Sequence, residues 1–202
     1  MLNVNDLTVA YGTKTVLDKL SYAFPEGKVI AITGLSGIGK TTLLNALAGL
    51  IRPVGGTVEH SFSKISYIFQ EPRLFPWMTA IENVDTVCGD REKALRHLTA
   101  LLPASAAEMY PEEMSGGMKQ RVSIARALAY EGDAYFLDEP FKGLDAQTRK
   151  ETMDYFFRET KGKTVLMVTH DEEDLACCDV ILRMEGSPVS SLILEKSNST
   201  LC

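Results

Sequence analysis

The sequence contains few cysteines, no long apolar run and no excess of positive charge. Its four cysteines are neither evenly spaced nor arranged as a C-x-x-C pair, so we expect neither a disulfide framework nor a zinc site, and a reducing cytoplasm suits them best. No stretch approaches the roughly eighteen apolar residues that cross a bilayer. The net charge of −6 disfavours nucleic acid as a main partner, because its phosphate backbone attracts clustered Lys and Arg.

The N-terminal segment carries no secretory pattern, and the C-terminal segment is polar. Residues 1–6 lack a basic region followed by an apolar segment, so we expect no secretory leader, and any membrane association must come through a partner protein. The polar segment Ser197–Thr200 is expected to be frayed. With 202 residues, 45% of them hydrophobic, and no internal repeats, we expect one large domain or a domain with an added lobe.

Strands and helices are predicted to alternate along most of the chain. Alternation and short apolar runs predict strands at residues 2–10, 22–24, 29–33, 57–58, 65–69, 134–137 and 164–168, with edge strands near Val180 and Leu192. Helical spacing predicts helices at 80–87, 91–102, 119–130 and 146–159, and from Lys40 through Leu50 to the Arg52–Gly56 cluster. This order favours an α/β fold with a mainly parallel sheet. The helices between Gln70 and Ser115 form a candidate helical lobe.

A glycine-rich loop at Gly34–Thr41 matches the P-loop pattern G-x-x-x-x-G-K-[ST] and follows a predicted strand, as that pattern requires. Its backbone N–H groups can approach nucleotide phosphates, Lys40 supplies a positive charge and Thr41 a hydroxyl for magnesium. The residues expected to contact nucleotide are Gly34, Ser36, Gly37, Ile38, Gly39, Lys40, Thr41 and Thr42. The loop alone leaves kinases, GTPases and helicases open, and a glycine-rich turn with a chance lysine is the structural alternative.

Two adjacent carboxylates, Asp138 and Glu139, end the apolar strand at 134–137. Successive side chains of a strand point to opposite sides, so we expect the two acids to have different tasks. The alternative is an acidic strand end that faces solvent.

A second candidate phosphate loop lies at Met114–Arg121, where Ser115, Gly116 and Gly117 precede a helix. A helix that begins there directs its positive end toward an anion. An ordinary serine cap of the helix is the alternative. Two such loops in one chain favour chemistry carried out by a pair of chains.

Together these motifs, running from Tyr11 to His170, resemble the nucleotide-binding subunit of ATP-binding cassette (ABC) transporters. The resemblance implies a single ABC ATPase domain over 1–202: a RecA-like P-loop core with a mainly parallel sheet, a small N-terminal antiparallel β subdomain, and a helical lobe at about 71–115. It implies ATP and Mg²⁺ as cofactors.

The resemblance also assigns roles to residues that carry no signal alone. It implies that Asp138 orients magnesium, that Glu139 polarises the attacking water, and that Gln70 contacts both magnesium and that water. His170 is expected to bond the terminal phosphate. It also implies that adenine stacks on Tyr11 and that Asp145 lies at the subunit junction. The ATP held by the opposite subunit would contact Ser115, Gly116 and Gly117. Taken alone, Gln70 reads as a solvent-facing residue, His170 as structural and Tyr11 as a half-buried strand tyrosine.

The sequence departs from the commonest family pattern at four positions. Thr41 replaces a serine but offers the same oxygen, and Met114 and Met118 replace Leu and Gln while the polar atoms that would touch phosphate are kept. Lys142 places a long cation near the expected subunit interface, where related sequences have small residues. The alternative is that Lys142 points to solvent.

The segment Gln70–Thr79 is similar to importers of nitrate, sulfonate and taurine, where it borders the groove that receives a permease helix. The apolar side chains there can form a docking surface, with a contribution to the core as the alternative. They are Leu74, Phe75, Trp77 and Met78. The predicted lobe is shorter than is usual for that group.

We therefore expect an ATP-hydrolysing importer subunit that acts as a homodimer around ATP. It would bind integral membrane permease subunits, with an extracytoplasmic solute-binding protein as an indirect partner. The expected location is cytoplasmic, peripheral on the inner face of the cell membrane. The alternatives are a soluble cassette acting in DNA repair or on ribosomes, an exporter subunit, and a degenerate cassette with a binding role.

Overall fold

A computed structural model describes residues 1–197, in which nine strands form one sheet of order β4-β1-β2-β9-β8-β3-β7-β6-β5. Ser197 ends the last strand, and the rest of the tail predicted to fray lies outside the described residues. The strands are β1 (Leu2–Tyr11), β2 (Lys14–Phe24), β3 (Val29–Thr33), β4 (Gly55–Glu59), β5 (Ile65–Ile68), β6 (Ala134–Asp138), β7 (Thr164–Val168), β8 (Val180–Gly186) and β9 (Val189–Ser197).

The helices confirm most of the predicted pattern within one or two residues. They are α1 (Lys40–Leu47), α2 (Ala80–Cys88), α3 (Arg91–Leu101), α4 (Gly116–Ala129), α5 (Ala146–Glu159) and α6 (Glu172–Ala176), with two short 3₁₀ turns at Ala104–Ala106 and Pro111–Glu113. No helix in the described part of the chain is long and apolar enough to cross a membrane.

The centre of the sheet is parallel, because β8, β3, β7, β6 and β5 run in the same direction. The central strands β6 and β7 are buried at every residue, as expected of parallel strands with both faces covered. In β6, Phe136 packs into the core on the side of α1, while its neighbours Tyr135 and Leu137 pack on the opposite side. This alternation divides the interior into two hydrophobic cores, one on each face of the sheet.

The antiparallel part of the sheet consists of β4, β1 and β2, as predicted for the N-terminal strands. It joins the parallel part through β9, which pairs antiparallel with β8 and meets β2 at a single pair, Leu17 with Val189. Asp6 has a positive φ of 48°, and the register of β1 shifts there. The shift lets both Val4 and Leu7 point into the core despite their odd spacing.

Helix α1 ends earlier than predicted. Gly49 adopts a left-handed conformation with φ 72° and donates its N–H to Ala46, while Leu50 donates to Asn45. This double hydrogen bond is the Schellman termination that a glycine after the last turn favours. Leu50 therefore lies outside the helix and is exposed, and the Arg52–Gly56 cluster is not what ends it.

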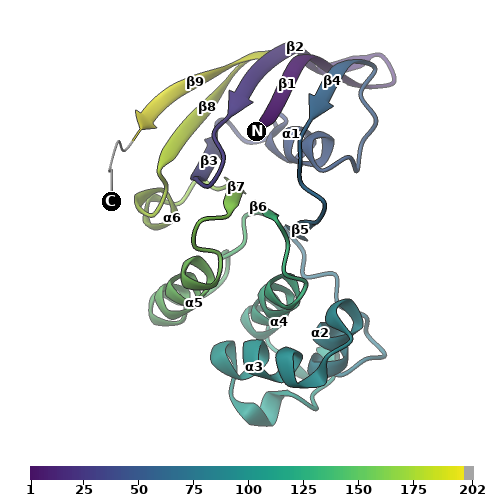
Figure 1. Cartoon of the computed structure of the whole chain (residues 1–202), viewed down its shortest axis with the longest axis vertical. Helices are drawn as coiled ribbons and strands as arrows, with labels where there is room; N and C mark the ends of the chain where they lie inside the picture. Colours follow the sequence, from purple (N-terminus) through teal and green to yellow (C-terminus); the bar gives the residue numbers. More distant parts are fainter. Residues whose placement is uncertain (198–202) are drawn as a thin grey trace.

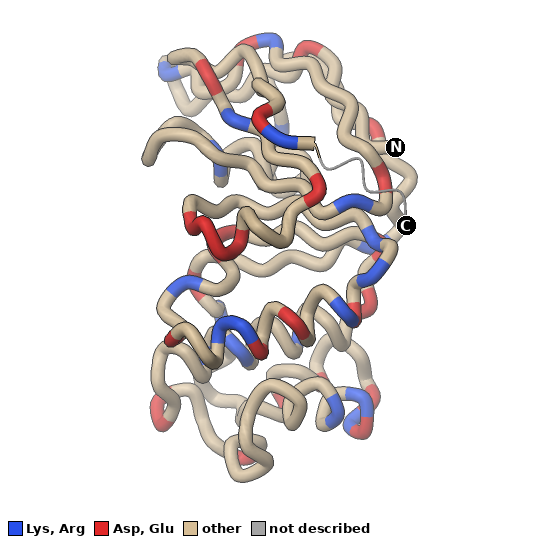
Figure 2. The backbone as a smooth tube through the Cα atoms, turned by 90° about the vertical axis from the view of Figure 1, so that its left-hand side faces the viewer, with Lys and Arg blue, Asp and Glu red and all other residues tan. Residues whose placement is uncertain are grey.

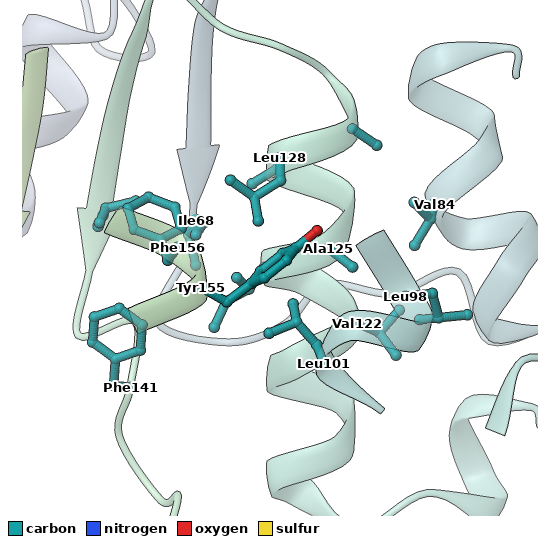
Figure 3. Close-up of a cluster of buried hydrophobic side chains, with 14 of the residues drawn as sticks. Ile68, Val84, Leu98, Leu101, Val122, Ala125, Leu128, Phe141, Tyr155 and Phe156 are labelled. Carbon is teal, nitrogen blue, oxygen red and sulfur yellow. The ribbon is translucent and has the colours of Figure 1, made fainter. Parts of the chain in front are cut away.

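The helical lobe extends away from the β-sheet in Figure 1, with α2 and α3 next to α4. Apolar side chains from these helices, from α5 and from β5 meet in one core, shown in Figure 3. Leu98 and Val122 lie on the lobe side of that core, and Phe141 and Phe156 lie on the side of α5. The lobe and the sheet therefore share a hydrophobic core.

Phe156 offers a test of this shared core. Its ring is fully buried and packs edge-to-face against Tyr135 and Phe141. Phe156→Ala should lower the free energy of unfolding by about 3–5 kcal/mol, because the transfer energy of the ring is lost and a cavity remains. In urea denaturation, the half-exposed Phe75→Ala serves as the matched control and should cost less than about 1 kcal/mol. Equal losses in the two variants would contradict the assignment of Phe156 to the core.

Candidate functional site

The predicted chemistry-bearing residues follow the carboxyl ends of four adjacent parallel strands. Lys40 follows β3, His170 follows β7, the pair Asp138 and Glu139 ends β6, and Gln70 follows β5. The order β3-β7-β6-β5 in the sheet therefore places these residues in a row along one edge. Ligands of α/β proteins bind at this edge.

The P-loop between β3 and α1 depends on its glycines. Gly39 caps α1 with a left-handed φ of 117°, and a Cβ on it would lie only 2.5 Å from the Val16 side chain. No other residue fits there without displacing that side chain. The Lys40 ammonium donates hydrogen bonds to the carbonyls of Gly34 and Leu35, at 2.8 and 3.0 Å, and so lies across its own loop.

Thr41 and Asp138 form the contact between the P-loop and β6. The Thr41 hydroxyl donates to the Asp138 carboxylate at 2.7 Å. Asp138 is 3% exposed, and burial raises its pKa although the hydrogen bond from Thr41 opposes that shift. A hydroxyl beside a buried carboxylate offers oxygen ligands of the kind that suit Mg²⁺, which binds few protein ligands and keeps oxygens of its nucleotide. Within residues 1–197 no three or more His, Cys, Asp and Glu side chains are grouped so that they could hold a metal ion.

Glu139 has an unusual backbone and three polar neighbours. Its φ is 47°, a conformation that side chains rarely adopt, and its N–H extends the ladder by bonding to the Val168 carbonyl. One carboxylate oxygen lies 3.4 Å from the Gln70 amide and 2.5 Å from the Lys142 ammonium, while the other lies 3.3 Å from His170 Nδ1. Three predicted site residues and Lys142 are thus brought together.

The environment of Glu139 favours its charged form. Burial alone would raise its pKa, but the hydrogen bond and the charge of Lys142 outweigh burial and lower it. Lys142 is 57% exposed and still pairs with Glu139, so the alternative that it points only to solvent is wrong.

The second candidate phosphate loop lies at the start of α4. Ser115 caps this helix by accepting a hydrogen bond from the Met118 amide at 3.2 Å, and α4 begins at Gly116, three residues before the predicted start. Within residues 1–197 the Ser115 hydroxyl has no other hydrogen bond, so it makes none to the P-loop of its own chain. Gln120, which the sequence did not single out, is buried in α4 and donates to the Pro140 carbonyl at 2.7 Å. It ties α4 to the loop that carries Glu139.

The last two predicted site residues lie at the ends of other elements. Asp145 caps α5 by accepting from the Thr148 amide, and that hydrogen bond lowers its pKa. Tyr11 ends β1 and is 51% exposed. Its register partner Lys14 lines a cavity of about 270 Å³ with P-loop residues including Ser36. The cavity lies beside the loop expected to hold phosphate.

Arg149 on α5 organises the segment that contains His170. Its guanidinium contacts Asp171 at 2.5 Å and Asp174 at 2.7 Å, and Asp174 also accepts from the Thr169 hydroxyl at 2.6 Å. Figure 2 shows this acidic turn, which includes α6, as a nearly continuous red stretch. The sequence analysis did not predict α6, which is only five residues long. It did not predict the cluster either, because Arg149 and its partners lie more than twenty residues apart in the chain.

The loop between Gln70 and α2 is held from two sides. Arg126 on α4 donates to the carbonyls of Pro72 and Arg73, at 2.8 and 3.0 Å. The buried Asn83 accepts from the Phe75 amide at 2.7 Å and donates to the Phe75 carbonyl. Of the four apolar side chains predicted here, Leu74 packs against the core while Phe75 and Trp77 are exposed by 38% and 68%.

The sequence model of the ABC transporter family matches residues 17–142, which include the P-loop, Gln70, the α4 loop and the two carboxylates. The chain belongs to the ABC transporter family. The P-loop edge described above is accordingly the candidate nucleotide site of a cassette.

Curated proteins and solved structures support the family over nearly the whole chain. The aliphatic sulfonates import ATP-binding protein SsuB 3 of Pseudomonas savastanoi pv. phaseolicola is 41% identical over 96% of this chain and 77% of the relative. The SsuB 2 protein of Rhodococcus jostii is 41% identical over 93% of this chain and 80% of the relative.

Two solved structures confirm the predicted α/β cassette fold. The dimeric bacterial ABC transporter cassette MJ0796 has a TM-score of 0.89 at 28% identity, covering 99% of this chain and all of that chain. The post-hydrolysis state of MJ0796, bound to ADP and Pi, has a TM-score of 0.88 at 29% identity with the same coverage.

Arg149→Ala should destabilise the cassette by about 3–5 kcal/mol, because it leaves the Asp174 carboxylate, 3% exposed, without its cationic partner. The matched control is Arg158→Ala on the same helix, whose side chain is 67% exposed and which should cost less than about 0.5 kcal/mol. Urea unfolding measures both. If Arg149→Ala unfolds at the same urea concentration as the control, the cluster is not structural.

Proposed function

We propose that this cassette is the ATP-hydrolysing subunit of an importer and that residues 1–202 form its single domain, with the helical lobe inserted at about 71–115. The observation that carries the proposal is the convergence of Lys40, Thr41, Asp138, Glu139 and His170 at one sheet edge. The curated relatives are named as ATP-binding proteins for the import of aliphatic sulfonates. Their names support a role of this chain in import and make an aliphatic sulfonate the candidate solute.

In this proposal the P-loop holds the phosphates of ATP. Its amides and the Lys40 ammonium bind the phosphate oxygens, together with Gly34, Ser36, Gly37, Ile38, Gly39 and Thr42, and adenine stacks on Tyr11. Thr41, Asp138 and Gln70 would hold Mg²⁺, which would stabilise the charge of the transferred phosphoryl group.

Glu139 polarises the attacking water, supported by its ionised state and its place beside Gln70 and His170. His170 bonds the terminal phosphate. Hydrolysis then depends on positioning and charge, because an in-line displacement by water needs little covalent chemistry from the protein.

The functional unit in this proposal is a homodimer. Ser115, Gly116 and Gly117 bind the terminal phosphate of ATP held by the partner, and Asp145 lies at the subunit junction. Two facts support it: Ser115 makes no hydrogen bond to its own P-loop within residues 1–197, and the similar MJ0796 cassette is dimeric. ATP can close the dimer only by binding the closed form better, and the partner's α4 loop supplies that difference.

The docking surface in this proposal consists of Phe75 and Trp77, which bind a cytoplasmic helix of an integral membrane permease. The two rings are exposed and lie 5.5 Å apart, on the loop that Arg126 and Asn83 hold. The same loop begins at Gln70, which contacts Glu139. Bonded contacts thus connect the hydrolysis site to the docking surface. The cassette would lie on the cytoplasmic face of the membrane through this permease, which receives solute from an extracytoplasmic binding protein.

Glu139→Gln tests the hydrolytic role. The amide keeps the shape of the side chain but cannot polarise water as a base, so turnover should fall by about 100-fold or more while ATP binding remains. With ATP and magnesium the variant should run as a dimer in size-exclusion chromatography.

The controls for this test are Lys40→Ala, which should lose ATP binding, and removal of magnesium with EDTA from the wild-type protein, which should stop hydrolysis. Undiminished phosphate release by Glu139→Gln would remove Glu139 from its proposed role. Hydrolysis by wild-type protein that stays monomeric at all ATP concentrations would exclude the shared site.

Changing Phe75 and Trp77 together to Ala tests the docking surface. Loss of two exposed aromatic anchors should weaken co-purification with the permease by about tenfold or more, while basal ATP hydrolysis stays unchanged. Leu95→Ala, an exposed apolar residue on α3 of the same lobe, is the matched control and should assemble normally. Normal assembly of the double variant would refute this docking surface.

A further inference from the structure

Lys142 is the departure from the family pattern that contacts Glu139 directly. It lies in the turn between β6 and α5, and its amide donates to the Glu139 carbonyl at 3.3 Å. That turn, together with the left-handed backbone of Glu139, brings the two side chains to the same side. Their charged ends meet at 2.5 Å.

The two carboxylates at the end of β6 have different hydrogen-bonding and charged partners. Asp138 accepts a hydrogen bond from the neutral Thr41 hydroxyl, at 2.7 Å. Glu139 has a cation of its own, because the Lys142 ammonium contacts it while the Lys40 ammonium bonds to P-loop carbonyls. The nearby polar groups, Gln70 and His170, lie farther from the Glu139 carboxylate, at 3.4 and 3.3 Å.

A negatively charged nucleotide entering beside Glu139 would be repelled by its carboxylate. Like charges a few ångströms apart interact unfavourably unless a counter-charge offsets them. The Lys142 ammonium, in contact with the Glu139 carboxylate, supplies such a counter-charge.

We propose that Lys142 is a positioning residue for nucleotide binding, which acts through Glu139 by neutralising its carboxylate and holding it against Gln70 and His170. The inference rests on the proposed function, since it takes the phosphates of ATP to bind at this edge. It assigns to Lys142 no contact with the nucleotide itself. Removing the ammonium therefore weakens nucleotide binding only while Glu139 carries a charge.

A double-mutant cycle on binding isolates this effect. We would measure the dissociation constant of the slowly hydrolysed ATP analogue adenylyl imidodiphosphate, with magnesium, by titration calorimetry. The proteins are wild type, Lys142→Met, Glu139→Gln and the double variant, with Lys142→Arg as the conservative rescue. Because Lys142 is 57% exposed, these variants should fold, and thermal unfolding confirms it.

Lys142→Met should weaken binding by about twofold to fivefold, the range expected for one partly exposed ion pair. Lys142→Arg should restore wild-type affinity, and the Met substitution should have no effect in the Glu139→Gln background. An unchanged affinity of Lys142→Met would overturn the inference and leave the proposed function standing. Equal weakening in both backgrounds would overturn it in favour of a direct phosphate contact. A wild-type protein that binds no analogue would overturn the proposed function itself.

Discussion

The parallel pairing of β3, β7 and β6 is the constraint on which the candidate site depends. Val168 of β7 pairs with Ile32 of β3 on one side and with Asp138 of β6 on the other, so the register fixes how far each strand reaches at the shared edge. The hydrogen bond from the Glu139 amide to the Val168 carbonyl extends this register one residue beyond the strand. A shift of β6 by one residue would exchange the sides of its two carboxylates and break the contact with Thr41.

Elements outside the sheet are tied to this edge by hydrogen bonds and ion pairs of three polar side chains, of which Gln120 is buried and Arg126 and Arg149 are partly buried. Gln120 holds α4 to the loop after β6, Arg126 holds the start of the lobe, and Arg149 holds the segment after β7 to α5. Loss of Gln120 would leave the buried Pro140 carbonyl unsatisfied, and loss of Arg149 would leave the buried Asp174 carboxylate without its cation. The proposed coupling between hydrolysis and docking thus has a physical route through discrete contacts whose removal can be measured.

The sequence predicted those parts of the fold and site whose signals are local. Buried strands such as β6 and β7 follow from apolar runs, and the P-loop follows from a fixed spacing between a strand and a helix. The ion pair of Lys142 with Glu139 depends on a left-handed backbone at a glutamate, which no residue preference indicates. Helix α6 is only five residues long, and its Asp174 is held by a distant arginine. The site roles still depend on resemblance, because neither spacing nor geometry alone tells a water-polarising glutamate from a structural one.

The two neighbouring carboxylates at the end of β6 have different surroundings. Asp138 faces the interior, where burial raises its pKa and where a hydroxyl is its partner, so a metal cation would stabilise its ionised form. Glu139, the next residue, lies outside β6, and its contact with Lys142 outweighs burial and lowers its pKa. Proteins give similar acids different roles by placing them in environments that shift their pKa values in opposite directions. The difference arises where β6 ends at Asp138 and the backbone of Glu139 becomes left-handed.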